Sequence, residues 1–214
     1  DDADVIWPSL IPKFTDTGFK KVKLSDEIFN KIKNEWNDKF HWPIKHEFKE
    51  GLNDTGSERY FISKLNSYVL PNDEFNYDLR DELKPVVEEW CGEKLEGTYT
   101  FGTRVYTDGA FLESHVDVSS THTFGVIINV DQKVNKPWPL QIHDGNDTHN
   151  IFLEPGEIIM LEGSRLLHGR EKALDGDYYA NIFLHYRPVD YKIPSPFLNM
   201  NYQVNWYPKD KDTF

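Results

Sequence analysis

The spacing of hydrophobic and polar positions along this chain of 214 residues is helical in the first half and strand-like in the second. In the first half, residues 26–38 and 78–90 place apolar side chains on one face at helical spacing, which predicts two helices. Ser25 supplies an N-cap oxygen for the first helix, and Gly92 is a natural stop for the second. Because proline cannot donate a backbone hydrogen bond, Pro85 predicts a bend in the second helix or a break into two short ones.

The segment between these helices, residues 40–77, is the least regular part of the chain and is rich in turn-forming Gly, Pro, Asn and Asp. A long irregular segment inside a compact domain is often functional. It is therefore interpreted either as a lid that closes over a substrate or as an insertion without a role. The sequence does not choose between the two.

After residue 97 the pattern changes to short alternating or β-branched stretches separated by Gly, Asp, Asn and Pro turns. Many short strands with such turns are typical of a β-sandwich or jelly roll. One further strand is expected near residues 19–24. The strands expected after residue 97 are Thr98–Tyr106, Thr121–Val130, Trp138–His143, Asn150–Leu153, Glu157–Leu161 and Tyr178–Tyr186.

The expected fold class is mainly β with N-terminal helices (α+β), on a double-stranded β-helix, or jelly-roll, core. No linker or repeat is visible, so a single domain is expected over residues 1–214. Within it, residues 1–97 give helical support and a possible lid, residues 98–190 form the jelly-roll core, and residues 191–214 form a C-terminal extension.

Composition and charge narrow the class of protein. A hydrophobic content of 38%, with 14% aromatic residues, is enough for a real core, and a formal net charge of −12 argues against nucleic acid or anionic membranes as partners. The single cysteine, Cys91, excludes an internal disulfide or a thiolate metal cage. No apolar run approaches the ~20 residues that span a bilayer, and the acidic start is not a signal peptide. A soluble protein is expected, with the cytoplasm slightly favoured; compartment and oligomeric state stay open.

Candidate chemistry begins in the segment Leu112–Val118, which reads as extended. Residues two apart on a strand project to the same face, so His115 and Asp117 can converge on one point. His168 follows fifty-one residues after Asp117. Two imidazoles and one carboxylate form the ligand set of non-haem Fe(II) sites, which leaves open positions for other ligands. The alternative is structural, with both histidines hydrogen-bonded at the edge of the core and Asp117 in a turn.

Residues 99–187 resemble the core of the Fe(II)/2-oxoglutarate-dependent dioxygenases, and more narrowly the prolyl 4-hydroxylase-like branch. The resemblance rests on four motifs that occur in the family's order. They are Arg104-Val105-Tyr106 leading to His115-x-Asp117, the run Thr123-Phe124-Gly125-Val126-Ile127-Ile128-Asn129, the turn and strand Glu154–Leu161, and Leu167-His168-Gly169-Arg170.

This resemblance implies that His115, Asp117 and His168 bind Fe(II). It implies 2-oxoglutarate and O₂ as co-substrates, and ascorbate as a possible addition. The hydroxyl groups of Tyr106 and Thr123 are implied to hydrogen-bond the co-substrate, and Tyr178 is a further candidate for the same role.

The chain departs from the family where the far carboxylate of 2-oxoglutarate should be bound. The prolyl hydroxylase type places a lysine about ten residues after the distal histidine, and this chain has Tyr178 there. A desolvated carboxylate needs a charge-assisted partner. Arg170 is the first choice because it shares a strand face with His168 if the strand continues. The alternative for Arg170 is a surface ion pair with Glu171 or Asp175, and the reserve cations are Arg104 and Lys172.

The expected function is therefore an Fe(II)- and 2-oxoglutarate-dependent oxygenase that hydroxylates an unactivated C–H bond. Its substrate is expected to be a prolyl or other residue of a peptide, or a free amino acid or small metabolite. Two rivals stay open, which are a non-catalytic β-sandwich binding module and a cupin-like metal enzyme that does not use 2-oxoglutarate. His185 is interpreted as a hydrogen-bonded core histidine.

Overall fold

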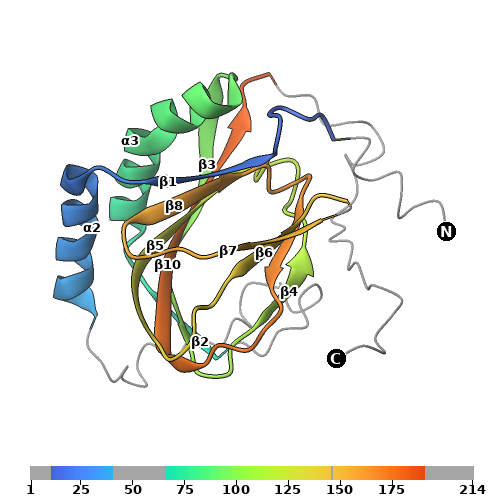
Figure 1. The fold of residues 1–214 in the computed structure, drawn as a ribbon. Coiled ribbons are helices and arrows are strands. Elements are labelled where there is room, and N and C mark those ends of the chain that lie inside the picture. Colours follow the sequence, from blue (N-terminus) through green and yellow to red (C-terminus); the bar gives the residue numbers. More distant parts are fainter. Residues whose placement is uncertain (1–10, 41–65, 146, 191–214) are drawn as a thin grey trace.

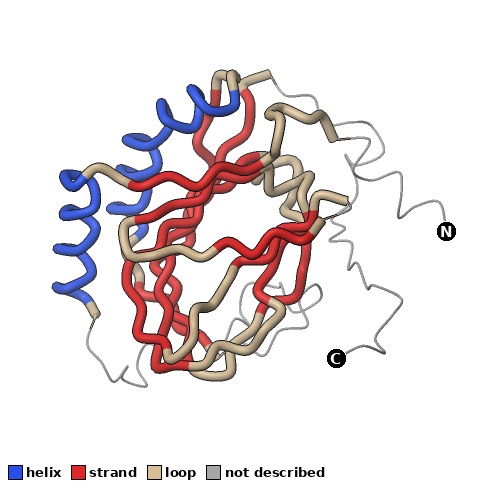
Figure 2. Tube along the Cα trace, viewed as in Figure 1, coloured by secondary structure: helices blue, strands red, loops and turns tan. Residues whose placement is uncertain are grey.

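A computed structural model describes residues 11–40, 66–145 and 147–190 and shows three layers (Figure 1). Two helices cover one face of a six-stranded antiparallel sheet, and a four-stranded antiparallel sheet packs on its other face (Figure 2). The elements are β1 (Phe19–Lys23), α2 (Asp26–Lys39), β2 (Ser67–Leu70), α3 (Asp73–Cys91), β3 (Leu95–Thr107), β4 (Leu112–His115), β5 (Phe124–Val134), β6 (Leu140–His143), β7 (Thr148–Ile151), β8 (Glu157–Leu161), β9 (Leu167–Arg170) and β10 (Gly176–Pro188).

The six-stranded sheet has the order β1-β8-β5-β10-β3-β2, and the four-stranded sheet has the order β4-β9-β6-β7. Because side chains alternate along a strand, the large sheet serves two cores at once. Val126 and Ile128 of β5 face the helices, whereas Ile127 between them faces the small sheet. The metal-ligand candidates lie on the side of the small sheet.

The helices fold as amphipathic covers of the large sheet. The Ser25 hydroxyl accepts a hydrogen bond from the amide of Ile28 and so caps α2. In α3, Leu83 and Val87 are fully buried against the sheet. Burial of each such side chain contributes about 1.5–3 kcal/mol, which together offsets the roughly 3 kcal/mol cost of a proline inside a helix. Of the two alternatives predicted at Pro85, the break is therefore wrong, because α3 continues through it, and the bend stays a prediction.

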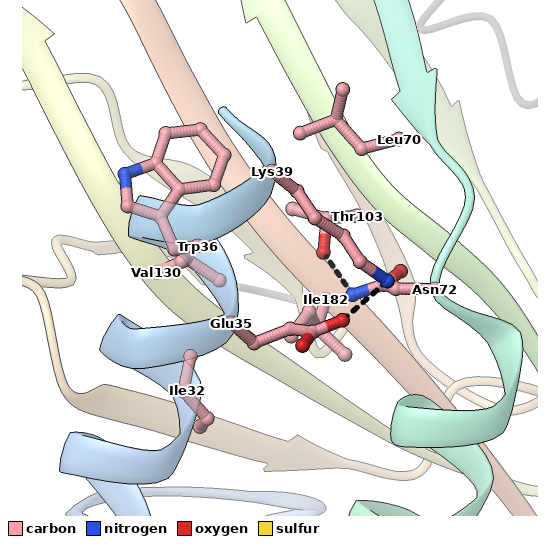
Figure 3. Close-up of a pocket in the computed structure, with 9 residues that line it drawn as sticks. All are labelled: Ile32, Glu35, Trp36, Lys39, Leu70, Asn72, Thr103, Val130 and Ile182. Carbon is pink, nitrogen blue, oxygen red and sulfur yellow. Dashed lines mark hydrogen bonds and ion pairs between the residues drawn. The ribbon is translucent and has the colours of Figure 1, made fainter. Parts of the chain in front are cut away.

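The start of α3 lies earlier than the sequence predicts. The helix begins at Asp73, and β2 lies just before it as an edge strand of the large sheet, so residues 66–77 are regular and do not form a lid. Asn72 anchors this junction, since its amide donates to the hydroxyl of Thr103 on β3 at 2.9 Å (Figure 3). The lid prediction for residues 41–65, and the extension at 191–214, fall outside the described residues.

Figure 3 shows a small pocket between α2 and the helix-facing side of the large sheet. Trp36 and Ile32 of α2 line it, and Glu35 pairs with Lys39 at its rim. It lies on the opposite side of the large sheet from the metal-ligand candidates. Within the described ranges, neither helix is long and apolar enough to cross a membrane.

A buried carboxylate ties the start of the described chain to the loop between β8 and β9. Glu162 is 1% exposed, and its carboxylate accepts hydrogen bonds from the amide and hydroxyl of Thr15 at 2.8 and 2.7 Å and from the amide of Phe14 at 3.3 Å. The Arg165 guanidinium donates to the same carboxylate at 2.6 Å. Because a buried charge must be paired and hydrogen-bonded, this network fixes the loop that precedes β9.

Candidate metal centre

Three ligand-type side chains meet on the side of the small sheet. His115 ends β4 and His168 lies directly opposite it on β9 in the antiparallel pairing. The Nε2 atoms of His115 and His168 lie 3.7 and 3.8 Å from the two oxygens of Asp117, and the ligand atoms of the three residues all lie within 4.8 Å of one another. Two ligands at right angles on one ion lie ~3 Å apart, so a small contraction would close the group around a metal.

Backbone carbonyls set the tautomer of both imidazoles. The Nδ1 of His115 lies 2.9 Å from the carbonyl oxygen of Glu113, and the Nδ1 of His168 lies 2.8 Å from that of Leu166. A carbonyl oxygen only accepts, so Nδ1 carries the proton in each ring. The neutral ring then has its lone pair on Nε2, the atom that faces Asp117. This is the arrangement in which histidine binds a divalent metal.

Asp117 reaches the group in a different way from the one the strand pattern predicts. β4 ends at His115, so Asp117 lies beyond the strand, and its amide donates to the carbonyl of Gly163 at 2.9 Å. A Cβ at Gly163 would lie 2.2 Å from Asp117 Oδ2. Glycine at position 163 therefore leaves the space that the carboxylate occupies.

Replacing Gly163 with alanine is expected to weaken metal binding by about 10–100-fold, the range found when groups that orient a ligand are changed. The added methyl group must displace the Asp117 carboxylate, while the hydrogen bond from the Asp117 amide to the carbonyl of residue 163 persists. Gly125→Ala is the graded comparison, because its Cβ would lie 3.8 Å from the same oxygen and should have a smaller effect. Iron titration followed by calorimetry measures both, and equal affinity of Gly163→Ala and the parent protein would contradict the expectation.

Burial and neighbouring charges keep His115 and Asp117 in the forms that bind metal. Burial lowers the pKa of His115 to about 4, and the nearby His168 adds to this effect. Burial opposes ionisation of Asp117, but the imidazoles of His168, His115, His122 and His185 hold its pKa below the ordinary value. Burial also lowers the pKa of His185 to about 3, with His122 acting in the same direction. Neutral imidazoles of His115 and His185 beside an ionised Asp117 carboxylate are therefore expected at neutral pH.

Arg170 lies next to the metal-ligand group, on the same short strand as His168. It is 2% exposed, and its guanidinium carbon lies 4.4 and 4.5 Å from the ring centres of Trp138 and Tyr179. Nη1 donates to the carbonyl of Trp138 at 2.7 Å. Nη2 is buried and forms no hydrogen bond with any residue that the structure describes.

The surface ion pair with Glu171 or Asp175 is not what the structure contains. Glu171 accepts from the hydroxyl of Ser114, and Asp175 pairs with Lys136. A buried guanidinium nitrogen without a partner costs free energy unless an acceptor binds it. The fork of Arg170 therefore fits an anionic oxygen of a bound ligand, which is the chemistry of the far carboxylate of 2-oxoglutarate.

The other predicted co-substrate residues lie in different surroundings. The Tyr106 ring is buried, packs edge-on against Trp138 with ring centres 5.2 Å apart, and its hydroxyl bonds no described residue. The Thr123 hydroxyl donates to the carbonyl of Ser119 at 3.1 Å and so braces the turn after Asp117. Contacts of both with the co-substrate stay predictions. Of the reserve cations, Lys172 is exposed and Arg104 donates to the hydroxyl of Ser67.

The prediction for Tyr178 is wrong, because its side chain lies on the helix-facing side of the large sheet. Its hydroxyl donates to Asp131 at 3.0 Å, and its ring packs against Phe40 with centres 5.0 Å apart. The neighbouring Tyr179 faces Arg170 instead. Side chains along β10 alternate between the two faces of the sheet. Counting back in steps of two from His185, which faces the small sheet, gives positions 183, 181 and 179, so this alternation identifies Tyr179.

Tyr178→Phe is consequently expected to leave the affinity for 2-oxoglutarate unchanged. Loss of the hydrogen bond to Asp131 should lower the free energy of unfolding by about 0.5–1.5 kcal/mol. Urea denaturation and co-substrate titration measure the two effects. A raised Michaelis constant for 2-oxoglutarate without loss of stability would restore the earlier prediction.

Several solved structures have a fold similar to that of this chain. HygX from Streptomyces hygroscopicus, with nickel, 2-oxoglutarate and hygromycin B bound, superposes with a TM-score of 0.55 over 83% of this chain and 85% of its own, at 13% identity. A prolyl-4-hydroxylase from Pseudomonas putida gives 0.52 over 86% and 99%, at 10% identity. A prolyl hydroxylase from Trichoplax adhaerens, in complex with a hypoxia inducible factor peptide fragment, gives 0.51 over 86% and 90%, at 12% identity.

This chain has the fold of the 2-oxoglutarate- and Fe(II)-dependent oxygenases. No protein-family model and no curated protein matches the sequence. Because the identities are only 10–13%, these similarities support the fold and do not identify a particular reaction. The likeness extends over 83–86% of this chain.

Proposed function

We propose that the protein is an Fe(II)- and 2-oxoglutarate-dependent oxygenase that hydroxylates an unactivated C–H bond. The observation that carries the proposal is the pairing of two features in one interior. A His115–Asp117–His168 group is able to hold a divalent metal, and a buried guanidinium beside it lacks one hydrogen-bond acceptor. A binding module has no need to assemble both.

The residues would divide the work between metal and co-substrate. His115, Asp117 and His168 would bind the iron on one side and leave its other coordination positions open. Arg170 would bind the far carboxylate of 2-oxoglutarate, with Trp138 and Tyr179 shielding that contact from water. When bound, the iron and 2-oxoglutarate supply the activation of dioxygen. Because the third ligand is a carboxylate, the site favours hydroxylation over halogenation, which needs that position for a halide.

The architecture proposed for this site is a single domain on a jelly-roll core. The two facing antiparallel sheets enclose the ligand group, and the edge strands β1 and β2 come from the N-terminal half of the chain. Of the similar structures, one has a small molecule, hygromycin B, bound and another is in complex with a peptide. Both classes are carried forward for this chain, a prolyl or other residue in a peptide and a free amino acid or small metabolite.

Release of succinate from 2-oxoglutarate, measured with Fe(II), O₂ and ascorbate, tests the proposal. Turnover that requires both iron and 2-oxoglutarate is expected, at a low rate without substrate and a higher rate with it. Iron binding without consumption of 2-oxoglutarate would favour the cupin-like metal enzyme. Absence of both iron binding and turnover would favour the binding module.

A further inference from the structure

A second group of rings lies beside the metal-ligand candidates and is separate from the residues assigned above to metal and co-substrate. Tyr99 and Phe101 of β3 are 51% and 44% exposed, so a large part of each aromatic side chain is open to a ligand. Their ring centres lie 6.3 Å apart, and each lies within 5.9 Å of the His122 ring, with all three planes within 22° of parallel. The His185 ring contacts both Phe101 and His122. These four residues are called the ring cluster below.

The strand register places the ring cluster next to Asp117. His185 pairs directly with Gly125 on β5, and paired residues point to the same face of a sheet. A Cβ at Gly125 would lie 3.8 Å from Asp117 Oδ2, so that face is the one that Asp117 occupies. His122 ends the turn that follows Asp117, because its amide donates to the carbonyl of Val118 at 2.8 Å. The ring cluster therefore borders the metal-ligand group.

His185 contributes a hydrogen-bond acceptor to this surface. Its side chain is 7% exposed, and its Nδ1 lies 3.1 Å from the carbonyl oxygen of Tyr99. Since the carbonyl only accepts, Nδ1 carries the proton and the neutral ring has its lone pair on Nε2. Nε2 has no hydrogen-bond partner among the described residues. The interpretation of His185 as a fully satisfied core histidine therefore accounts for only one of its two nitrogens.

Three properties of the ring cluster select the same ligand chemistry. The lone pair of His185 requires a hydrogen-bond donor. The half-exposed aromatic rings of Tyr99 and Phe101 can attract a cation through the ring quadrupole. The chain carries a formal net charge of −12, which draws cations and repels anions. A protonated amine satisfies all three, whereas a carboxylate satisfies none.

We propose that the ring cluster binds a protonated amine of the substrate, with the ammonium group against Tyr99 and Phe101 and one N–H directed to His185 Nε2. This inference rests on the proposed oxygenase function and specifies its substrate class. The amine can belong to a small molecule or to a lysine side chain of a peptide. The ring cluster holds it beside the metal, so the C–H bond that reacts lies in the carbon chain attached to that nitrogen.

Anaerobic calorimetry on the protein loaded with Fe(II) and 2-oxoglutarate tests the proposal. The probes are n-butylamine with its N-acetyl amide, and a lysine-containing peptide with its Nε-acetyl form, because acetylation removes the charge and leaves the carbon chain. At least one amine is expected to bind about tenfold more tightly than its amide. The free amine and the peptide arms separate the two sources.

Matched variants locate the binding. Tyr99→Ala, Phe101→Ala and His185→Phe are each expected to weaken amine binding severalfold, to about tenfold, and to leave 2-oxoglutarate affinity unchanged. Phe152→Ala is the control, since Phe152 is 46% exposed but borders a cavity at the far end of β5, beside Gln132 and Lys133. It should change nothing.

Equal affinity for amine and amide, preference for an anionic probe, or no binding of any probe would overturn the amine site. Its failure differs from failure of the proposed function. Substrate-free conversion of 2-oxoglutarate to succinate would persist in the first case and be absent in the second. Amine binding without any such conversion would leave the amine site standing and remove the oxygenase function.

Discussion

Replacing Asp117 with alanine is expected to abolish iron-dependent turnover of 2-oxoglutarate and to lower iron affinity by more than about 100-fold. Changes in groups that only orient a ligand cost 10–100-fold, and Asp117 is the one anionic ligand of the group. The two neutral imidazoles cannot balance the charge of a divalent ion. Iron content after dialysis and succinate formation measure the two effects.

Asp144→Ala is the matched control for this experiment. Asp144 also pairs with an imidazole, since one of its oxygens lies 2.8 Å from Nε2 of His149, but this pair lies at the partly exposed turn between β6 and β7. Loss of that carboxylate should leave iron content and turnover as they are. An Asp117→Ala protein that retains stoichiometric iron and full turnover would remove Asp117 from the metal site.

Replacing Arg170 with alanine is expected to weaken 2-oxoglutarate binding by about 30-fold or more, because loss of one partner of a buried charge pair costs roughly 2–5 kcal/mol. Arg170→Lys should give an intermediate loss. Lysine keeps the charge but cannot present the two-pronged fork or stack between Trp138 and Tyr179. Calorimetric titration of the iron-loaded protein with 2-oxoglutarate measures the affinity, and iron content should stay unchanged.

Lys172→Ala separates Arg170 from the reserve candidate. Lys172 lies two residues further along and is exposed, so its removal should leave co-substrate affinity unchanged. An unchanged affinity in Arg170→Ala, with a folded and iron-loaded protein, would mean that another cation binds the far carboxylate. Arg104 would then be the next candidate.

Alternation and turn chemistry were sufficient to predict most strands of the fold. The segments around β5, β8 and β10 were predicted within a few residues of where the structure has them. The errors come from tertiary contacts that local pattern does not contain. Burial of Leu83 and Val87 carries α3 through Pro85, and the bond from Asn72 to Thr103 fixes the start of α3 near β2.

The ligand set at the candidate site was predictable, but the way its members meet was not. His115 and Asp117 converge because the chain leaves β4 and bonds to Gly163, a residue forty-six positions away. Family spacing pointed to Tyr178, whereas alternation along β10 points to Tyr179, and the alternation rule is the one that the structure follows. The ring cluster is formed by two strands, β3 and β10, and by the turn before β5, which folding brings together, and no local pattern marks it.

The hydrogen bonds to the Glu162 carboxylate make residues near the start of the described chain part of the support for the metal-ligand group. Phe14 and Thr15 bond the loop that begins at Glu162, and the next residue of that loop, Gly163, holds Asp117. A shortened protein that begins at β1 would keep every described strand and the three candidate ligands, yet the buried Glu162 carboxylate would lose its hydrogen bonds from Phe14 and Thr15 and keep the one from Arg165. The residues before β1 are therefore expected to contribute to iron binding although they supply no ligand.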